Sequence, residues 1–336
     1  MRDEIAQKCG SVDAAAFESF VDWLRRLYVI EMPNFIDRNF DTPLDLLSSP
    51  RALVQLLRLG AFGRLGAAVR RRFTDPRLHR LFSFQAMYAG LAPESALALY
   101  AVITYMDSIE GVWFPEGGIH AVPMIMAQVA EKAGVTFRYG DAGAEVLRSP
   151  QGRVAGVRTA SGERIVADAV VCTTDLPTAY QQLLSDLRPP RAAGHGRYSP
   201  SAVVWHVGVR GLPSPSAAHH NIHFGTEWSS AFDALLKRGE LMPDPSRLVT
   251  IPSLDDSDLA PDGCSTLYVL EPVPNLNGVI NWSSEAGRLR DRLHVFLAEQ
   301  GYPTDMITED LITPIEWQAQ GMATFAARRL HAMRTS

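Results

Sequence analysis

Three closely spaced histidines, His219, His220 and His223, form the densest group of potential metal ligands in the sequence. On a β-strand, the side chains of His219 and His223 would lie on one face and that of His220 on the other. A metal site needs further well-placed ligands and a supporting shell of hydrogen bonds. We therefore interpret these histidines as a polar pair at a strand edge and predict no metal site.

A glycine pair, Gly117 and Gly118, stands between an aromatic segment and an amphipathic helix. Glycines before a helix often mark a place where a phosphate or a flat cofactor lies against bare backbone. Two interpretations of the preceding Trp113 and Phe114 remain open: they line an apolar pocket, or they join a core cluster beside the next helix. The face of that helix predicted to be buried consists of Val122, Ile125, Met126 and Val129.

A second glycine series, Gly60, Gly63 and Gly66, does not have the spacing of a dinucleotide-binding turn, which is G-x-G-x-x-G after a buried strand. Its context is helical, so we interpret it as a site of close helix packing. The sequence contains neither that fingerprint nor a Walker loop, an HExxH motif or a G-x-S-x-G motif.

The stretch from Arg51 to Arg72 contains six arginines and no acidic residue, interleaved with Leu, Val and Phe. Such a pattern is compatible with an interfacial helix that meets anionic lipid headgroups. It is equally compatible with the solvated basic face of an ordinary globular protein. Both interpretations stay open at this point.

The overall composition is that of a globular protein: 46% of the 336 residues are hydrophobic and 21% are charged. The net charge of -5 argues against a general nucleic-acid binder. Three dispersed cysteines, Cys9, Cys172 and Cys264, predict a reducing compartment. The charged N-terminus does not resemble a signal peptide, and the apolar stretch 95–106 is too short to span a bilayer. These features predict a soluble or membrane-surface protein.

The first part of the chain is predicted to be helical. Helical spacing from Asp13, a plausible cap, relates Phe17, Phe20, Leu24 and Leu27. A second helix should begin at Ser49–Pro50 and continue to about residue 72. A third, buried helix is expected from Pro93 to about Ser108.

The later sequence has a period of two in short runs separated by turn residues, which predicts strands. The expected strands are VTFRY, GAEVLR, RVAGVRT and RIVADAVVCTT, followed by SAVVWHVGVRG, NIHFG, RLVTIPS and STLYVLEPV. The nearly continuous apolar run VADAVVCTT is typical of a strand covered on both faces. A final helix is expected from Ser284 to Glu299.

The segment FSFQAMYAGLAPESALALYAVITYMDSIEGVWFPEGGIHAVP, residues 82–123, strongly resembles bacterial phytoene desaturases of the flavin amine oxidase superfamily. The resemblance continues through AGAEVLRSPQGRVAGVRTASGERIVADAVVCTTD and IPSLDDSDLAPDGCSTLYVLEPVPNL to about Met322. It implies an α/β protein: a partial glutathione-reductase-like FAD-binding fold with a helical cap and a mixed β-sheet substrate domain. The implied domains are 1–110 (cap), 111–190 (FAD-binding part), 191–312 (substrate domain) and 313–336 (divergent tail).

The resemblance also implies the reaction, which is FAD-dependent introduction of C–C double bonds into phytoene in carotenoid biosynthesis. The implied location is cytoplasmic, at the membrane surface. The implied cofactor-binding residues are Gly117, Gly118, Val146, Thr173, Thr174 and Asp175. The implied substrate pocket includes Phe82, Phe84, Trp113 and Phe114. No catalytic residue is carried over.

The sequence departs from the family pattern at both ends. It lacks the family's G-x-G-x-x-G turn, and ATFAARRLHAMRTS stands where the family has a glycine-rich segment that covers the flavin. These departures predict an incomplete, inactive copy. The alternatives are a non-catalytic isoprenoid-binding or membrane-surface protein derived from the family, and a carotenoid isomerase or saturase of the same superfamily.

Overall fold

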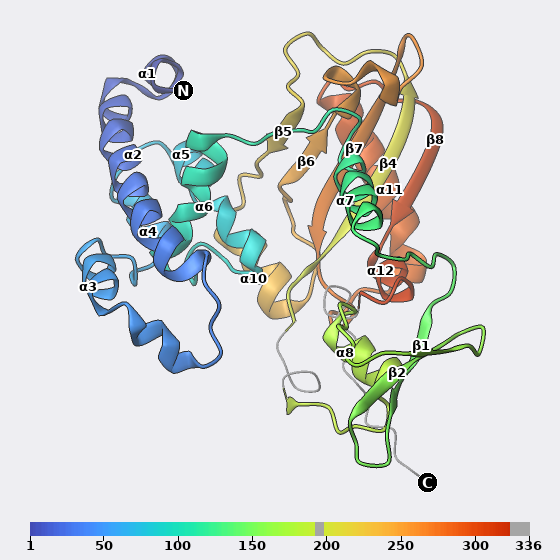
Figure 1. Ribbon diagram of the computed structural model, residues 1–336. Coiled ribbons are helices and arrows are strands. Elements are labelled where there is room, and N and C mark those ends of the chain that lie inside the picture. Colours follow the sequence, from blue (N-terminus) through green and yellow to red (C-terminus); the bar gives the residue numbers. More distant parts are fainter. Residues whose placement is uncertain (192–197, 323–336) are drawn as a thin grey trace. The chain divides into compact units, whose positions relative to one another are not determined.

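The computed structural model describes residues 1–191 and 198–322. The chain divides into two compact units, Met1–Trp113 and Phe114–Ser336, here called the helical unit and the sheet unit (Figure 1). The boundaries predicted at residues 190 and 312 lie within the sheet unit and stay predictions, and most of the predicted tail lies outside the described residues.

The described part of the helical unit consists of α-helices joined by short 3-10 or π turns, labelled η. The α-helices are α1 (Arg2–Cys9), α2 (Ser11–Glu31), α3 (Pro50–Arg58), α4 (Leu65–Arg70), α5 (Pro76–Leu81) and α6 (Ala101–Tyr105). The turns are η1 (Met32–Ile36), η2 (Pro43–Ser48), η3 (Phe84–Ala89), η4 (Ala98–Tyr100) and η5 (Met106–Glu110).

Helix α2 organises the core of the helical unit, as its apolar spacing predicts. Phe20, Leu24 and Leu27 are fully buried along one face, and Phe20 packs against the rings of Phe73 and Phe82 at centroid distances of 5.1 and 5.0 Å. Burying such aromatic side chains is a large favourable contribution to folding.

Asp13 does not cap α2, which corrects the sequence prediction. The N-cap residue is Gly10, and Asp13 is fully buried within the helix. Its carboxylate accepts hydrogen bonds from the Thr74 amide at 2.7 Å, the Thr74 hydroxyl at 2.9 Å and the Asp75 amide at 3.0 Å. The carboxylate therefore ties α2 to the loop that begins α5, since a buried carboxylate must be hydrogen-bonded.

The second predicted helix begins at the predicted residue but ends well before the predicted residue 72. Helix α3 starts at Pro50, then ends at Arg58, and Gly60 follows with a φ of +73°. Glycine adopts this left-handed conformation without the cost that a Cβ would bring, so the chain turns before α4 begins. The third prediction is similar, because its buried helix is divided into η4, α6 and η5.

A five-stranded antiparallel sheet and one long helix build the main core of the sheet unit. The strands β4 (Ser201–Arg210), β5 (His220–His223), β6 (Arg247–Thr250), β7 (Cys264–Val273) and β8 (Asp305–Ile312) have the order β5-β6-β7-β4-β8. Helix α11 (Trp282–Glu299) buries Leu289, Leu293 and Leu297 in a cluster with Val203 and Trp205 of β4. The predictions of β4, β5, β6, β7 and the final helix are confirmed, whereas β8 was not predicted.

Short helical segments lie between the strands of the sheet unit, and the last of them follows β8. They are α8 (Leu176–Thr178), η6 (Ala179–Leu183), α10 (Ser229–Asp233), η7 (Ala234–Arg238), η8 (Pro252–Leu254), η9 (Ser257–Leu259) and α12 (Pro314–Ala319).

A second, three-stranded sheet contains β1 (Gly143–Arg148), β2 (Val154–Thr159) and β3 (Arg164–Val166), paired antiparallel in chain order. The predicted meander is therefore confirmed for these strands. The segment VTFRY is not a strand, and β3 ends at Val166. Residues 169–172 form no strand, and Val171 is 88% exposed, so the prediction of a doubly covered strand there is wrong.

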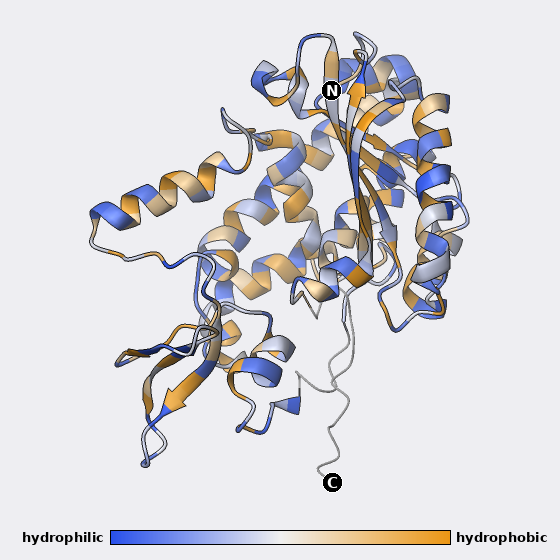
Figure 2. Cartoon of the chain, turned by 90° about the vertical axis from the view of Figure 1, so that its right-hand side faces the viewer, coloured by the Kyte–Doolittle hydropathy of each residue, from blue (hydrophilic) through white to orange (hydrophobic). Residues whose placement is uncertain are grey.

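Helix α7 (Ala121–Lys132) contains no buried residue, which overturns the prediction for its apolar face. Val122, Ile125, Met126 and Val129 are all exposed. Figure 2 colours the chain by hydropathy and shows hydrophobic residues interspersed with hydrophilic ones along the helices. Apolar spacing identified a face that needs cover, but no described element of the sheet unit buries it.

No helix among residues 1–191 and 198–322 has the length and apolar character needed to cross a bilayer.

Candidate functional site

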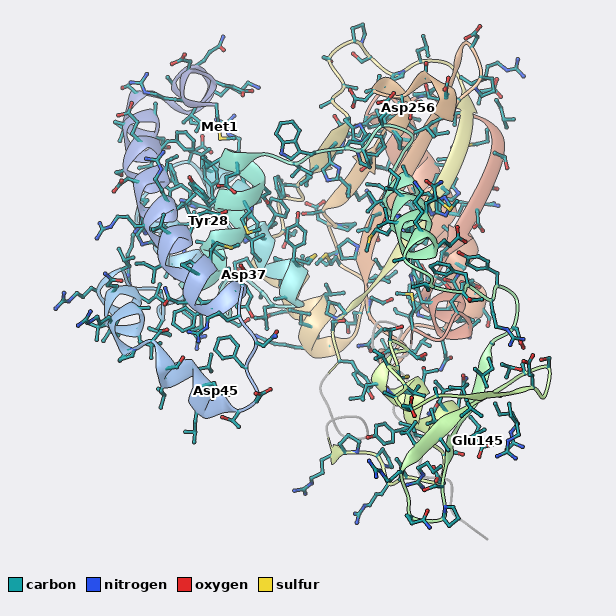
Figure 3. All side chains as sticks on the ribbon, in the orientation of Figure 1. Met1, Tyr28, Asp37, Asp45, Glu145 and Asp256 are labelled. Atoms are coloured by element: carbon teal, nitrogen blue, oxygen red, sulfur yellow. The ribbon has the colours of Figure 1, made fainter. Side chains whose placement is uncertain are left out.

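The glycine turn before α7 is fixed by the loop that contains η8 and η9. The Gly117 amide donates a hydrogen bond to the Asp256 carboxylate at 3.0 Å, and Asp256 is labelled in Figure 3. Gly117 and Gly118 have φ values of +79° and +80°, which side chains with a Cβ rarely adopt. A Cβ on Gly118 would also meet the Leu259 side chain at 3.8 Å, an ordinary contact. Backbone conformation therefore explains both glycines.

The aromatic residue before the turn packs on one of the predicted histidines. The rings of Phe114 and His219 are tilted, with centroids 4.4 Å apart. His219 lies just before β5, and its Nδ1 is 2.5 Å from the Asp255 carboxylate. Asp255 and Asp256 are neighbours, so one acidic loop holds both the glycine turn and the histidine beneath Phe114. Sequence reasoning missed this loop as part of the site.

The other two histidines have separate partners. His220 Nδ1 is 2.9 Å from the Thr250 hydroxyl, on the adjacent strand β6. His223 Nε2 is 2.8 Å from the Tyr302 hydroxyl. Partial burial lowers the pKa of both histidines from the ordinary value, which favours neutral rings. Within the described ranges, no group of three His, Cys, Asp or Glu side chains is arranged to hold a metal ion.

The remaining predicted cofactor-binding residues lie elsewhere in the sheet unit. Val146 is buried in β1, opposite Val157 of β2. Thr173 and Thr174 are exposed, and Asp175 is the N-cap residue of α8. The glycine turn therefore lies beside the N-terminus of η9, whereas Val146 lies in the three-stranded sheet.

The four predicted pocket residues are divided between the two units. Phe82 is fully buried in the core of the helical unit, and Phe84 packs on Tyr88 at a centroid distance of 5.7 Å. Trp113, the last residue of that unit, is 88% exposed. Phe114 belongs to the sheet unit and packs on His219.

Comparison with known proteins gives the same family as the sequence resemblance. Residues 8–245 match the family described as flavin containing amine oxidoreductase. The chain is 44% identical over 329 residues to "Phytoene dehydrogenase" of Streptomyces griseus, covering 96% of this chain and 63% of that protein. It is 35% identical over 295 residues to "zeta-carotene-forming phytoene desaturase" of Myxococcus xanthus, covering 86% of this chain and 56% of that protein.

Solved structures agree on the fold. An oxidoreductase from Methanosarcina mazei superposes with a TM-score of 0.52 at 16% identity, covering 80% of this chain and 61% of that one. Identity this low shows the fold alone. With the family match, it confirms the predicted fold class, an α/β fold of the flavin containing amine oxidoreductase family. The chain spans less than two thirds of the length of the curated relatives named above.

The described residues do not by themselves form a complete site for the flavin that the family implies. The Gly117 amide, a natural donor to a phosphate, is already bonded to a carboxylate, and that negative charge opposes an anionic phosphate. Residues 169–172, which the sequence predicted as a buried strand beside the cofactor, are not in a strand, and Val171 and Cys172 are exposed. The glycine turn alone is not a phosphate cradle.

Proposed function

The chain belongs to the flavin-containing amine oxidoreductase family, and we propose that it serves the desaturation of phytoene-like polyenes in carotenoid biosynthesis. The observation that carries this proposal is the 44% identity, over 96% of the chain, to a protein named phytoene dehydrogenase. Identity of that extent runs through both the helical unit and the sheet unit, so the likeness is not confined to one motif.

The reaction would remove one hydrogen from each of two adjacent carbons, so a double bond forms and two electrons pass to an acceptor. FAD is the acceptor that the family implies. We propose that Gly117, Gly118, Val146, Thr173, Thr174 and Asp175 face that cofactor. We also propose Phe82, Phe84, Trp113 and Phe114 as substrate contacts, although Phe82 would have to act from within the core.

A direct test combines the purified chain with FAD and phytoene-loaded vesicles and separates the products by chromatography. A product with a longer conjugated system and visible absorption is the expected result. No such product, under conditions in which a curated relative yields one, would contradict the desaturase proposal for this chain. An isomerised or more saturated product would instead favour a carotenoid isomerase or saturase.

A second candidate function is non-catalytic binding of an isoprenoid. The observation that favours it is the engagement of the Gly117 amide by Asp256, which leaves the turn without a free phosphate donor at that position. The flavin test separates the two candidates. FAD that remains with the protein through gel filtration supports the desaturase, whereas retention of phytoene without FAD supports the binding protein.

We further propose a cytoplasmic location at the membrane surface, since a substrate such as phytoene partitions into lipid. The net charge of -5 gives no support to a nucleic-acid partner.

A further inference from the structure

The consecutive elements η2 and α3 of the helical unit carry a set of exposed large apolar side chains. We call it the η2–α3 surface, and it contains Leu44, Leu46, Leu47, Val54 and Leu57. Leu44 is 73% exposed and Leu57 is 66% exposed, which is far more than a core helix requires. Exposed apolar residues are ordinary when scattered, but a cluster on consecutive elements marks an interaction surface.

Core packing does not account for these side chains. Helix α3 meets the core through Ala52 and Leu56, which are buried, while Val54 and Leu57 point away from that face. The preceding turn η2 is fixed by its own cap: the Asp45 carboxylate accepts hydrogen bonds from the Thr42 and Asp41 amides at 2.7 and 3.0 Å. The leucines of η2 are therefore held on a defined turn (Asp45 is labelled in Figure 3).

Beside this surface lies a hollow of about 420 Å³ between α2 and α3. Arg25 and Arg26 of α2 and Arg58 of α3 line it, with Val29 and Leu59 among its apolar residues. None of these three arginines makes an ion pair or side-chain hydrogen bond with any residue in the described ranges. The acidic side chains nearest in sequence are Asp22 and the buried Glu31 on α2, and Asp37, Asp41 and Asp45 before α3.

Unpaired guanidinium groups suit the anionic headgroup layer of a bilayer surface, and exposed leucines suit the apolar layer beneath it. Guanidinium binds phosphate strongly because its fixed fork of donors fits the phosphate oxygens. The apolar side chains would enter the boundary between headgroups and acyl chains, as in an interfacial helix. α3 contributes no acidic side chain, and the one acidic side chain of η2, Asp45, accepts hydrogen bonds from the Thr42 and Asp41 amides.

We propose that the η2–α3 surface docks on a bilayer that contains anionic lipid, with a headgroup phosphate in the hollow between Arg25, Arg26 and Arg58. The inference rests on the membrane location proposed above and specifies the surface and the lipid charge. It makes one of the two interpretations of the basic segment 51–72 specific, because Arg58 is the arginine of that segment that lines the hollow.

Vesicle flotation tests the proposal with the full chain, because aggregates sink while vesicle-bound protein rises. The vesicles are phosphatidylcholine alone or a mixture with phosphatidylglycerol. The variant is Arg25→Gln/Arg26→Gln/Arg58→Gln. Each arginine near an anionic surface strengthens partitioning about fivefold, so the triple variant should bind the mixed vesicles roughly 100-fold more weakly.

A charge-matched control is Arg153→Gln/Arg164→Gln/Arg188→Gln, three exposed arginines of the sheet unit. It should float with the mixed vesicles as the unsubstituted chain does. Equal loss in both triple variants would overturn the proposed site, because it would show an effect of net charge alone. Equal flotation of the Arg25/Arg26/Arg58 variant and the unsubstituted chain would also overturn it.

A second variant, Leu47→Ser/Leu57→Ser, tests the apolar half of the surface. Each change should weaken binding about tenfold, and unlike the arginine effect this loss should persist at high salt. Failure of the unsubstituted chain to bind any vesicle would overturn both this inference and the proposed membrane location. Vesicle binding that neither the arginine variant nor the leucine variant weakens would overturn this inference alone. The desaturation assay is independent of either result.

Discussion

The five-stranded sheet and the α7–β3 segment, residues 121–166, show two different outcomes of similar apolar patterns. α11 buries Leu289, Leu293 and Leu297 against the sheet, and the resulting cluster includes Trp205. α7 has an apolar face of comparable length, yet none of its residues is buried. The difference is that the sheet supplies a partner face for α11, whereas the described residues supply none for α7.

This contrast separates two kinds of sequence signal. A periodic apolar face indicates which side of a helix would be stabilised by burial. The free energy of burial is gained only where a second surface removes that face from water. The five-stranded sheet is complete in that sense. The apolar side chains of α7 contribute little to folding in the described structure, so substitutions in the two helices should have unequal effects.

The largest expected effect is in the closed core. Leu293→Ala should lower the free energy of unfolding by about 2–5 kcal/mol, because it removes a fully buried side chain and leaves a cavity. Urea unfolding followed by tryptophan fluorescence measures the change, since Trp205 belongs to the same cluster. A loss below about 0.5 kcal/mol, which is usual for surface positions, would show that this core is not tightly packed.

An intermediate effect is expected where the glycine turn meets the acidic loop. Asp256→Ala removes the acceptor of the Gly117 amide, a contribution of about 1 kcal/mol. Amide exchange at Gly117 should therefore accelerate about fivefold to tenfold, as measured by hydrogen exchange. Asp262→Ala, at an exposed position farther along the same loop, is the control and should leave that exchange rate unchanged.

The smallest effect is expected in α7. Ile125→Ala should change the free energy of unfolding by no more than about 0.5 kcal/mol, because the side chain is 59% exposed and alanine favours helix. The same urea experiment measures it, with Leu293→Ala as the matched large-to-small substitution. A loss comparable to that of Leu293→Ala would mean that α7 is covered in solution, for example by a second copy of the chain.

Local sequence patterns predicted most helices and strands, and the errors arose mainly where contacts between distant residues fix the structure. Helical spacing located α2 and α11, and alternation located β4–β7, because each pattern lies within one short segment. The true role of Asp13 depends on Thr74, which is 61 residues away. No local pattern indicates that pairing.

The candidate site was predicted even less completely. Gly117 and Gly118 were recognised from their position before a helix, but the Gly117 partner, Asp256, is 139 residues away. His219 was noted only as part of a histidine group, although Asp255 and Phe114 are its neighbours in the fold. The exposure of Val171 was not predicted either, because an apolar run in the sequence does not show which element, if any, packs on it.

One buried group in the helical unit ties its folding to proton exchange with the solvent. Glu31, at the end of α2, is 4% exposed, and its Oε1 has no partner among the described residues. Burial raises its pKa to about 8, whereas an unfolded glutamate titrates near its ordinary value of about 4.3. The folded group is therefore protonated between those two values, and unfolding at pH 6–7 should release about one proton.

Since the folded state binds the additional proton, the stability contributed at low pH declines as the pH rises from about 4.3 towards 8. Calorimetry would detect the release directly: the apparent enthalpy of unfolding at pH 7 should differ between phosphate and Tris in proportion to their ionisation enthalpies. Glu31→Gln should abolish most of that difference, so the helical unit would no longer exchange this proton with its buffer when it folds.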